Sequence, residues 1–353
     1  MNLNNQLLIC SYYFVYDINE FQQDLLSDNL EYIFHSILCE ILYRKCEHMD
    51  IKCKKSGDLI SRLEREGCII NFDDNSKIVC ISDVHRGNGG YEDSLRLNEN
   101  IYKAALNYYY NNGYTLIEIG DGDELWKNKN ILSIAYNYND VFRILRKFYK
   151  KNRLYLLYGN HDIIKSHSEF IVKQKKVYNN IGDDFPCEMI NLYSQIKFYE
   201  CAVLKYLPLN KEILAFHGHQ ADAMNCEFWK ISRFLVRYIW RFMEGVGGMK
   251  PPTSPASNYD KGDKIDKILS KLSKKENKMI ICGHTHNDKF PAPSEGLYFN
   301  DGCCVFPSAI TSIEINNGEI SLVKWKIEVD DKNSLYIKKF VTGGPEKISD
   351  YLK

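Results

Sequence analysis

The chain has 353 residues, and its 46 lysines and arginines balance 46 aspartates and glutamates, giving a formal net charge of zero. This balance argues against a strongly basic nucleic-acid-binding surface, so nucleic acid is not an expected partner. No run approaches the ~18 apolar residues of a membrane span, and the N-terminus lacks the features of a secretion signal. We expect a cytoplasmic protein whose 12 scattered cysteines are reduced.

Residues 1–75 are predicted to form an N-terminal extension without recognisable chemistry. Residues 7–15 have the composition of a strand. Apolar residues recur near helical spacing over 20–42, which predicts one or two amphipathic helices. The charged segment Ser56–Glu66 predicts a further helix that ends at Gly67.

From residue 77 the chain repeats one pattern five times: an apolar run typical of a buried strand ends at residues that ligate metals. The five segments are KIVCISDVHR (77–86), LIEIGDGDELW (116–126), LYLLYGNHD (154–162), ILAFHGHQ (213–220) and MIICGHTH (279–286). Helices are predicted over 95–110 and 140–150, and this alternation indicates an α/β layered core. The carboxyl ends of its strands would bring the polar residues to one edge.

The histidines are concentrated in these loops. Seven of the nine lie in or just after them: His85, His161, His167, His217, His219, His284 and His286. Asp121, Asp123 and Glu124 also place three carboxylates within four residues, a cluster that usually needs a cation. Taken alone, this cluster is better explained as a solvated acidic turn. Its recurrence beside four similar loops favours metal binding.

The ordered motifs resemble those of the calcineurin-like metallophosphoesterases. The matching segments are DVH at 83–85, GDGDE at 120–124, GNHD at 159–162, HGH at 217–219 and GHTH at 283–286. Within that superfamily, SDVH, GDGDELW and GHQ resemble the bacterial branch that includes UDP-2,3-diacylglucosamine hydrolases. The resemblance implies a four-layer β-sandwich flanked by helices over residues 76–330, in place of one doubly wound sheet. A helical insertion at 222–278 and a C-terminal tail at 331–353 complete the expected organisation.

The resemblance also implies a site for two divalent metal ions. Manganese is expected first, with iron or zinc as alternatives, because the ligands are nitrogen and oxygen without a thiolate. The expected ligands form two sets, Asp83, His85 and His286 for one ion and Asn160, His217 and His284 for the other, with Asp121 as the bridge. A hydroxide that bridges the metals would attack a phosphoester or pyrophosphate in line.

Asp121 and His161 are the expected catalytic residues. His161 would stabilise the phosphoryl charge or protonate the leaving oxygen, and the alternative is that its ring only orders the loop. Glu124 stands where the family commonly has Asp, so the partner of His161 stays open between Glu124, Asp123 and Asp162. Other residues expected to support the site or contact substrate are His219, Arg86 and Asn300. For Arg86 a phosphate contact and a solvated charge are equally expected.

Residues 226–244 alternate aromatic with basic side chains, the latter including Lys230, Arg233 and Arg237. One interpretation is a lid or a membrane-surface helix that admits a lipid-linked substrate. The other is a helix that packs in the core or forms a homodimer. A solvated helix is predicted over 263–278, a strand over 297–305, and a hairpin about the turn at 316–318. From residue 330 the polar tail is expected to be partly ordered.

The sequence therefore predicts a cytoplasmic phosphohydrolase that acts on a phosphorylated small molecule or a lipid-linked substrate. A protein serine/threonine phosphatase is less favoured, because GDGDELW lacks the arginine of GDxVDRG. The alternative from another class is a non-catalytic scaffold that binds a protein or membrane partner. The complete set of expected ligands disfavours the scaffold.

Overall fold

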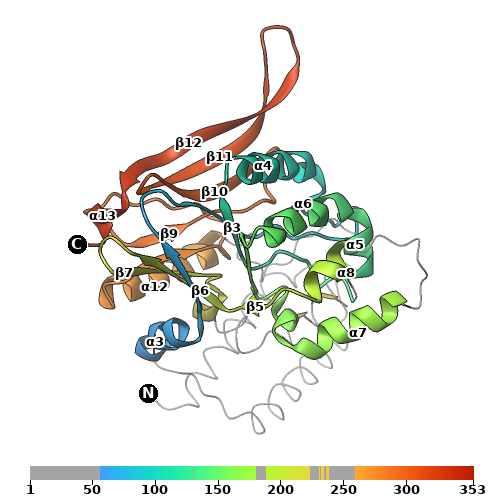
Figure 1. Ribbon diagram of the computed structural model, residues 1–353, viewed down its shortest axis with the longest axis horizontal. Helices are drawn as coiled ribbons and strands as arrows, with labels where there is room; N and C mark the ends of the chain where they lie inside the picture. The colour runs from blue at the N-terminus through green and yellow to red at the C-terminus, as the bar shows by residue number, and fades with distance from the viewer. Residues whose placement is uncertain are drawn as a thin grey trace, which may run out of the picture. The chain divides into compact units, whose positions relative to one another are not determined.

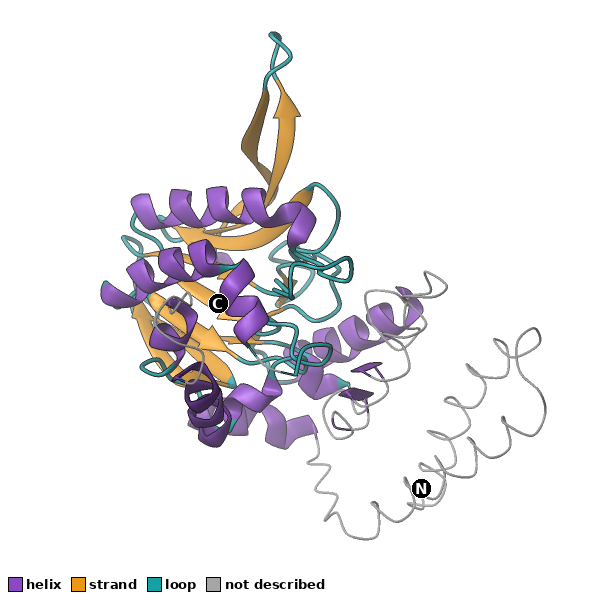
Figure 2. Ribbon diagram, turned by 90° about the vertical axis from the view of Figure 1, so that its right-hand side faces the viewer, coloured by secondary structure: helices purple, strands orange, loops and turns teal. Residues whose placement is uncertain are grey.

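A computed structural model describes residues 56–129, 131–179, 188–222, 230, 232–233, 236–237 and 259–353. The strand and helices expected within residues 1–55 lie outside the described residues, as does most of the aromatic segment 226–244. The described chain forms an α/β fold in which two mixed sheets are flanked by helices (Figures 1 and 2). No helix of this described part is long and apolar enough to span a membrane.

The larger sheet has seven strands in the order β12-β11-β10-β2-β3-β4-β5. Four of them run parallel: β2 (Lys77–Ile81), β3 (Thr115–Ile119), β4 (Leu154–Leu157) and β5 (Phe198–Tyr199). An antiparallel edge is added by β10 (Ala309–Asn316), β11 (Glu319–Val329) and β12 (Leu335–Lys347). The hairpin expected about the turn at 316–318 is confirmed, because it joins β10 to β11.

The smaller sheet has five strands in the order β1-β6-β7-β8-β9. They are β1 (Cys68–Phe72), β6 (Cys201–Tyr206), β7 (Lys211–Phe216), β8 (Met279–Cys282) and β9 (Tyr298–Asn300). Its apolar face packs on the larger sheet. Ile78 and Ile117 of the larger sheet share one buried cluster with Ile213 and Ile281 of the smaller sheet. The expectation of two packed sheets is therefore confirmed.

Helices cover the outer face of each sheet (Figure 2). Over the larger sheet lie α4 (Glu99–Asn111), α5 (Leu132–Asn137), α6 (Asn139–Lys150), α7 (Ser168–Asn179) and α8 (Glu188–Tyr193). Over the smaller sheet lie α3 (Ser56–Glu66) and α12 (Tyr259–Lys275). The helix expected over 263–278 is confirmed as α12, but its full solvation was wrong, because Ile265, Leu269 and Leu272 pack against Leu214 of β7. Its lysines occupy the opposite stripe of an amphipathic helix.

The C-terminal tail is also more regular than its polarity indicated. β12 pairs along its length with β11, and α13 (Ile348–Tyr351) packs between the sheets. Beyond the body of the fold, β11 and β12 continue as a two-stranded arm (Figure 1). Both faces of such a ribbon are exposed to water. Its strands therefore lack the apolar run by which buried strands are recognised in a sequence. Near the body, Lys339 of β12 contacts Glu314 of β10 at 2.9 Å.

A buried ion network lies beneath the ends of β2, β3 and β4. Arg86, which has no exposed surface, donates through Nε to Asp123 at 2.7 Å and through its two terminal nitrogens to Glu118, each at 2.7 Å. Lys165 donates to Asp162 at 2.7 Å and lies 2.7 Å from Asp123. The two expectations for Arg86, a phosphate contact and a solvated charge, were therefore both wrong. Its charge is satisfied by carboxylates inside the protein.

The same network ties neighbouring loops together through Asp162. Its Oδ1 accepts the backbone N–H of Gly159 at 2.8 Å, and its Oδ2 accepts the N–H groups of Gly122 and Asp123 at 3.1 and 3.3 Å. The loops that follow β3 and β4 are consequently fixed to each other by one side chain.

We expect Arg86→Met to lower the free energy of unfolding by about 3–5 kcal/mol, because it leaves Glu118 and Asp123 as buried charges without a guanidinium partner. The matched control is Arg143→Met, which removes an exposed ion pair with Asp140 and should change stability by less than about 1 kcal/mol. Urea denaturation measures both. Equal effects of the two substitutions would contradict the assigned burial of Arg86.

We expect Trp325→Ala on β11 to destabilise the fold by about 3–5 kcal/mol. The Trp325 ring lies 5.2 Å from that of Tyr108 between centroids, and its Nε1–H donates to the Tyr109 hydroxyl at 2.9 Å. Val329→Ala on the exposed arm of the same strand should change stability by less than about 0.5 kcal/mol. Thermal or urea unfolding distinguishes these outcomes, and a neutral Trp325→Ala would contradict the packing of β11 on α4.

Candidate metal centre

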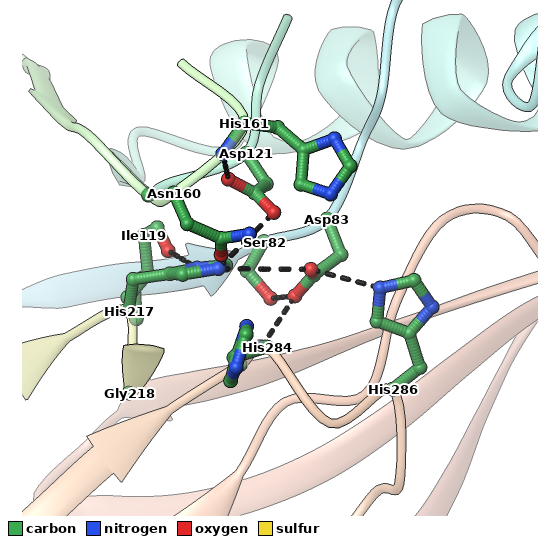
Figure 3. A network of polar contacts seen from close by, with 12 residues as sticks. Ser82, Asp83, Ile119, Asp121, Asn160, His161, His217, Gly218, His284 and His286 are labelled. Atoms are coloured by element: carbon green, nitrogen blue, oxygen red, sulfur yellow. Dashed lines mark hydrogen bonds and ion pairs between the residues drawn. The ribbon is translucent and has the colours of Figure 1, made fainter. Parts of the chain in front are cut away.

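The five motif loops emerge at one edge of the two sheets. Asp83 follows β2, Asp121 follows β3 and Asn160 follows β4, while His217 follows β7 of the smaller sheet and His284 follows β8. The turn after β3 requires glycine, because a Cβ on Gly120 would lie 2.7 Å from the backbone nitrogen of Gly159 and its φ is 82°. Figure 3 shows the polar side chains from both sheets pointing toward one another. Residues up to 203 positions apart in the chain thus meet at one place.

The candidate ligands form groups that could each hold a cation. Asp83, His85 and His286 bring one ligand atom each within 4.8 Å of one another, and so do Asp121, His217 and His284. His85, Asp121 and His161 form a third such group, which shares His85 with the first and Asp121 with the second. Oδ2 of Asp121 lies 3.2 Å from His217 Nε2 and 3.8 Å from His85 Nε2. Asp121 therefore stands between the two groups, where a bridging carboxylate would have to be.

Several of these side chains present a buried polar atom that has no hydrogen-bond partner among the described residues. The atoms are His85 Nε2, Asn160 Oδ1, His217 Nε2 and His284 Nε2. His286 turns Nε2 toward Asp83 Oδ1 at 2.9 Å, so its Nδ1 faces away from the other ligands (Figure 3). Each such atom costs about 1–3 kcal/mol when it is left unsatisfied. Nitrogen and oxygen donors of this kind suit divalent transition metals, so the residues present fit a pair of such ions.

The backbone of the site is strained in the same places. Asp83, His85, Asp121, His284 and His286 all adopt positive φ, between 50° and 69°. This left-handed region is uncommon for residues other than glycine, and it costs of order 1–3 kcal/mol per residue. The strained residues are five of the candidate ligands. This indicates that the conformation of these loops is set by the direction in which the ligand side chains point, rather than by the preferred φ of the backbone.

The electrostatics keep the carboxylates ionised. Burial opposes the charged form of Asp121, but the neighbouring His217 and His161 outweigh it and hold the pKa of Asp121 below its usual range. In turn, burial lowers the pKa of His217, while Asp121 and Asp83 outweigh burial and raise it to about 9. Anionic carboxylates are the form in which Asp ligates a metal.

One contact fixes which nitrogen of His217 faces the site. Its Nδ1 lies 2.9 Å from the carbonyl oxygen of Ile119, so Nδ1 carries the hydrogen and donates. Nε2 is then left directed at Asp121. A backbone carbonyl behind the ring is the usual way in which proteins orient a ligating histidine.

His161 lies at the rim of the site, and the question of its partner is answered by Glu124. Nδ1 of His161 lies 3.0 and 2.9 Å from the two oxygens of Glu124. The other two candidates, Asp123 and Asp162, are engaged in the buried ion network. The ring of Trp126 stacks on His161 with 4.1 Å between centroids, and its Nε1–H donates to the carbonyl of Asn160 at 2.7 Å. His161 is thus held on one edge and on one face.

Asn300 and His219 are both buried beside the site. Nδ2 of Asn300 donates to the carbonyl of Gly283 at 2.8 Å and to Thr285 Oγ1 at 3.0 Å, so Asn300 holds the loop that carries His284. The ring of His219 lies 5.5 Å from that of His217 between centroids, outside both ligand groups. Burial and the neighbouring rings of His217 and His284 lower the pKa of His219 to about 3. His167, by contrast, is exposed.

Sequence reasoning missed three residues that the structure places in the site. Asp222 lies 3.5 Å from His284 Nε2, and Trp126 stacks on His161. Ser82 contacts both Asp83 and Asp301, the residue that follows the expected site residue Asn300. All three missed residues lay within or beside the motif segments, where a polar or aromatic side chain next to a ligand was the available signal.

No curated protein sequence matches the chain. A predicted phosphoesterase from Streptococcus pneumoniae is similar in structure, with 13% identity and a TM-score of 0.30 over 75% of this chain and 97% of that one. Vps29 from Chaetomium thermophilum has 9% identity and a TM-score of 0.34, covering 75% of this chain and 97% of that one. A putative 5'-nucleotidase from Staphylococcus aureus has 10% identity and a TM-score of 0.29, covering 77% and 55%.

The sequence model of one family, described as calcineurin-like phosphoesterase, matches residues 76–288. The match spans all five motif loops and more than half of the chain, so the chain belongs to the calcineurin-like phosphoesterase family.

Proposed function

We propose that this protein is a hydrolase that uses two divalent metal ions, manganese first, to cleave a phosphoester or pyrophosphate bond. The observation that carries the proposal is the convergence of buried nitrogen and oxygen atoms without partners around Asp121. Two divalent ions bound there would neutralise charge on the phosphoryl oxygens and activate water as the nucleophile at neutral pH. The proposed substrate is a phosphorylated small molecule or a lipid-linked phosphate in the cytoplasm.

Asp121 has the geometry of a shared ligand. Its Oδ1 accepts the backbone N–H of His161 at 2.8 Å, and this contact fixes the rotation of the carboxylate. Oδ2 is left on the side of His85 and His217. The carboxylate therefore links the position of His161 to the positions of both ligand groups.

His161 is proposed to act on the substrate rather than on a metal. Because Glu124 accepts a hydrogen bond from Nδ1, the opposite nitrogen, Nε2, is the one available to the phosphoryl group or the leaving oxygen. The stacked Trp126 shields one face of the ring from water. This arrangement fits a group that donates a proton or a hydrogen bond in a fixed direction.

The segment 226–244 is proposed to border the site as a lid. Arg237 donates to the carbonyl oxygens of Trp126 at 2.7 Å and Leu125 at 2.6 Å, in the loop that also carries Glu124. This contact favours the lid over a helix that only forms a dimer, whereas the buried Ser232 and Val236 fit a helix that packs in the core equally well. Contact with a membrane surface is a finer proposal that follows from the lid. A substrate of the kind cleaved by UDP-2,3-diacylglucosamine hydrolases is a second one, and it follows from the resemblance of SDVH, GDGDELW and GHQ to that branch.

The decisive experiment compares metal-stripped wild type with Asp121→Asn, each supplied with manganese. We expect wild type to hydrolyse at least one of bis-p-nitrophenyl phosphate, p-nitrophenyl phosphate and a UDP-linked acyl sugar. Asp121→Asn should lose that activity, because an amide cannot neutralise two cations. Asp140→Asn, an exposed substitution, is the control. A wild type that binds no metal would instead favour the scaffold alternative.

A second prediction separates His161 from the metal ligands. His161→Asn should lower kcat by about 10²–10⁴-fold, the usual contribution of a positioned acid, while metal content stays unchanged. His167→Asn, the same substitution at an exposed histidine, should leave both quantities unchanged. Steady-state kinetics and metal analysis of the purified variants provide the measurement. Loss of metal together with activity in His161→Asn would show that His161 is a ligand.

A further inference from the structure

The hydroxyl of Ser82 lies between two buried carboxyl groups. Its Oγ is 2.5 Å from Oδ2 of Asp83 and 2.6 Å from Oδ1 of Asp301. All three residues are buried, with exposed fractions of 1%, 0% and 0% respectively. Asp83 follows β2 and Asp301 follows β9, so this chain of contacts joins the two sheets behind a candidate ligand.

The number of hydrogens available to these three groups is decisive. A serine hydroxyl carries a single hydrogen and can donate it to only one acceptor. If both carboxyls were ionised, one of these contacts would place two oxygen lone pairs against each other at hydrogen-bond distance. One of the two carboxyls must therefore carry a hydrogen and donate it to Ser82.

The surroundings of Asp83 favour its charged form. Oδ2 of Asp83 also accepts the backbone N–H of His284 at 2.8 Å, and Oδ1 lies 2.9 Å from His286 Nε2.

The surroundings of Asp301 favour its neutral form. Among the described residues, its Oδ2 has no hydrogen-bond partner. An ionised carboxylate would leave a charged oxygen buried without a donor, whereas the neutral acid leaves only a carbonyl oxygen. Consistently, burial raises the pKa of Asp301 well above its usual range.

We propose that Asp301 is a positioning residue that works as a neutral carboxylic acid, donating its hydrogen to Ser82, which donates in turn to Asp83. The inference deepens the proposed function, since it concerns a ligand of the metal site. With Ser82 and the His284 N–H both on Oδ2, the Asp83 carboxylate cannot rotate, and Oδ1 is the oxygen presented to a cation. Asp301 thereby orients the ligand without adding a negative charge to the centre.

Substitution by asparagine tests the neutral form directly. The side-chain amide of Asp301→Asn has the shape of the acid and can donate to Ser82 Oγ, so manganese affinity measured by calorimetry should be retained. Asp301→Leu has a similar size but no donor, and Ser82→Ala breaks the chain of contacts. Both should weaken manganese binding by about 10–100-fold, the usual effect of losing a residue that orients a ligand. Asp263→Asn, on exposed α12 surface, is the control.

Infrared spectroscopy gives a readout that needs neither metal nor substrate. Wild type should show the carbonyl stretch of a buried protonated carboxylic acid, shifted in D2O, and Asp301→Asn should lose it. The proposal is overturned if this band is absent from wild type, if it persists in Asp301→Asn, or if Asp301→Asn weakens manganese binding as much as Asp301→Leu. Thermal melting establishes that each variant is folded. Lack of turnover on every phosphoester would count against the proposed function and leave this result unchanged.

Discussion

The site depends on two buried cations, Arg86 and Lys165, that neutralise the carboxylates beneath it. Taking a charge out of water costs several kcal/mol, and the cost is recovered only when every partner is in place. Glu118 and Asp123, from the segment 116–126, and Asp162, from the segment 154–162, provide those partners. Because Asp162 also accepts N–H groups from two loops, the network sets the shape of those loops before any ligand arrives. The candidate ligands are thus supported by a second set of charged side chains, Arg86, Lys165 and their carboxylate partners, which are all buried.

The buried ion network around Arg86 and Lys165 explains how the loops can keep a strained backbone. Five candidate ligands sit in left-handed backbone conformations, and several carry buried atoms without partners. Neither feature would persist in a loop that was free to relax. The surrounding network and the two packed sheets prevent relaxation, so the donors are arranged in advance for a cation. A bound cation would satisfy atoms that are otherwise costly to bury, and the centre would then be both preorganised and dependent on its ions.

The candidate ligands and the strands that carry them could be predicted because both are local properties of the sequence. An apolar run followed at once by Asp, Asn or His identifies a strand end and a donor within ten residues. The roles of Arg86 and Asp162 could not be predicted in this way, because each depends on partners 32 to 40 positions away. One signal was present but was not used. Glu118 stands inside the buried strand TLIEI, and a carboxylate in such a strand requires a buried cation nearby. β12 could not be predicted, because the part of it that forms the arm is polar. Both faces of the arm are exposed to water, so its sequence lacks the apolar run of a buried strand.

Glu124 shows how one methylene can change the connections within a site. Its carboxylate lies 2.9 Å from His161 Nδ1 and 3.3 Å from His85 Nδ1, and the two imidazole rings meet edge to face with 4.7 Å between centroids. A carboxylate that accepts from both Nδ1 atoms places both Nε2 atoms on the side of the metal centre. Aspartate, the commoner residue here, is shorter by about 1.5 Å, the length of one carbon–carbon bond, and from the same backbone position would reach one ring at the expense of the other. In this chain the orientation of a candidate metal ligand and that of the candidate proton donor are therefore set by a single side chain.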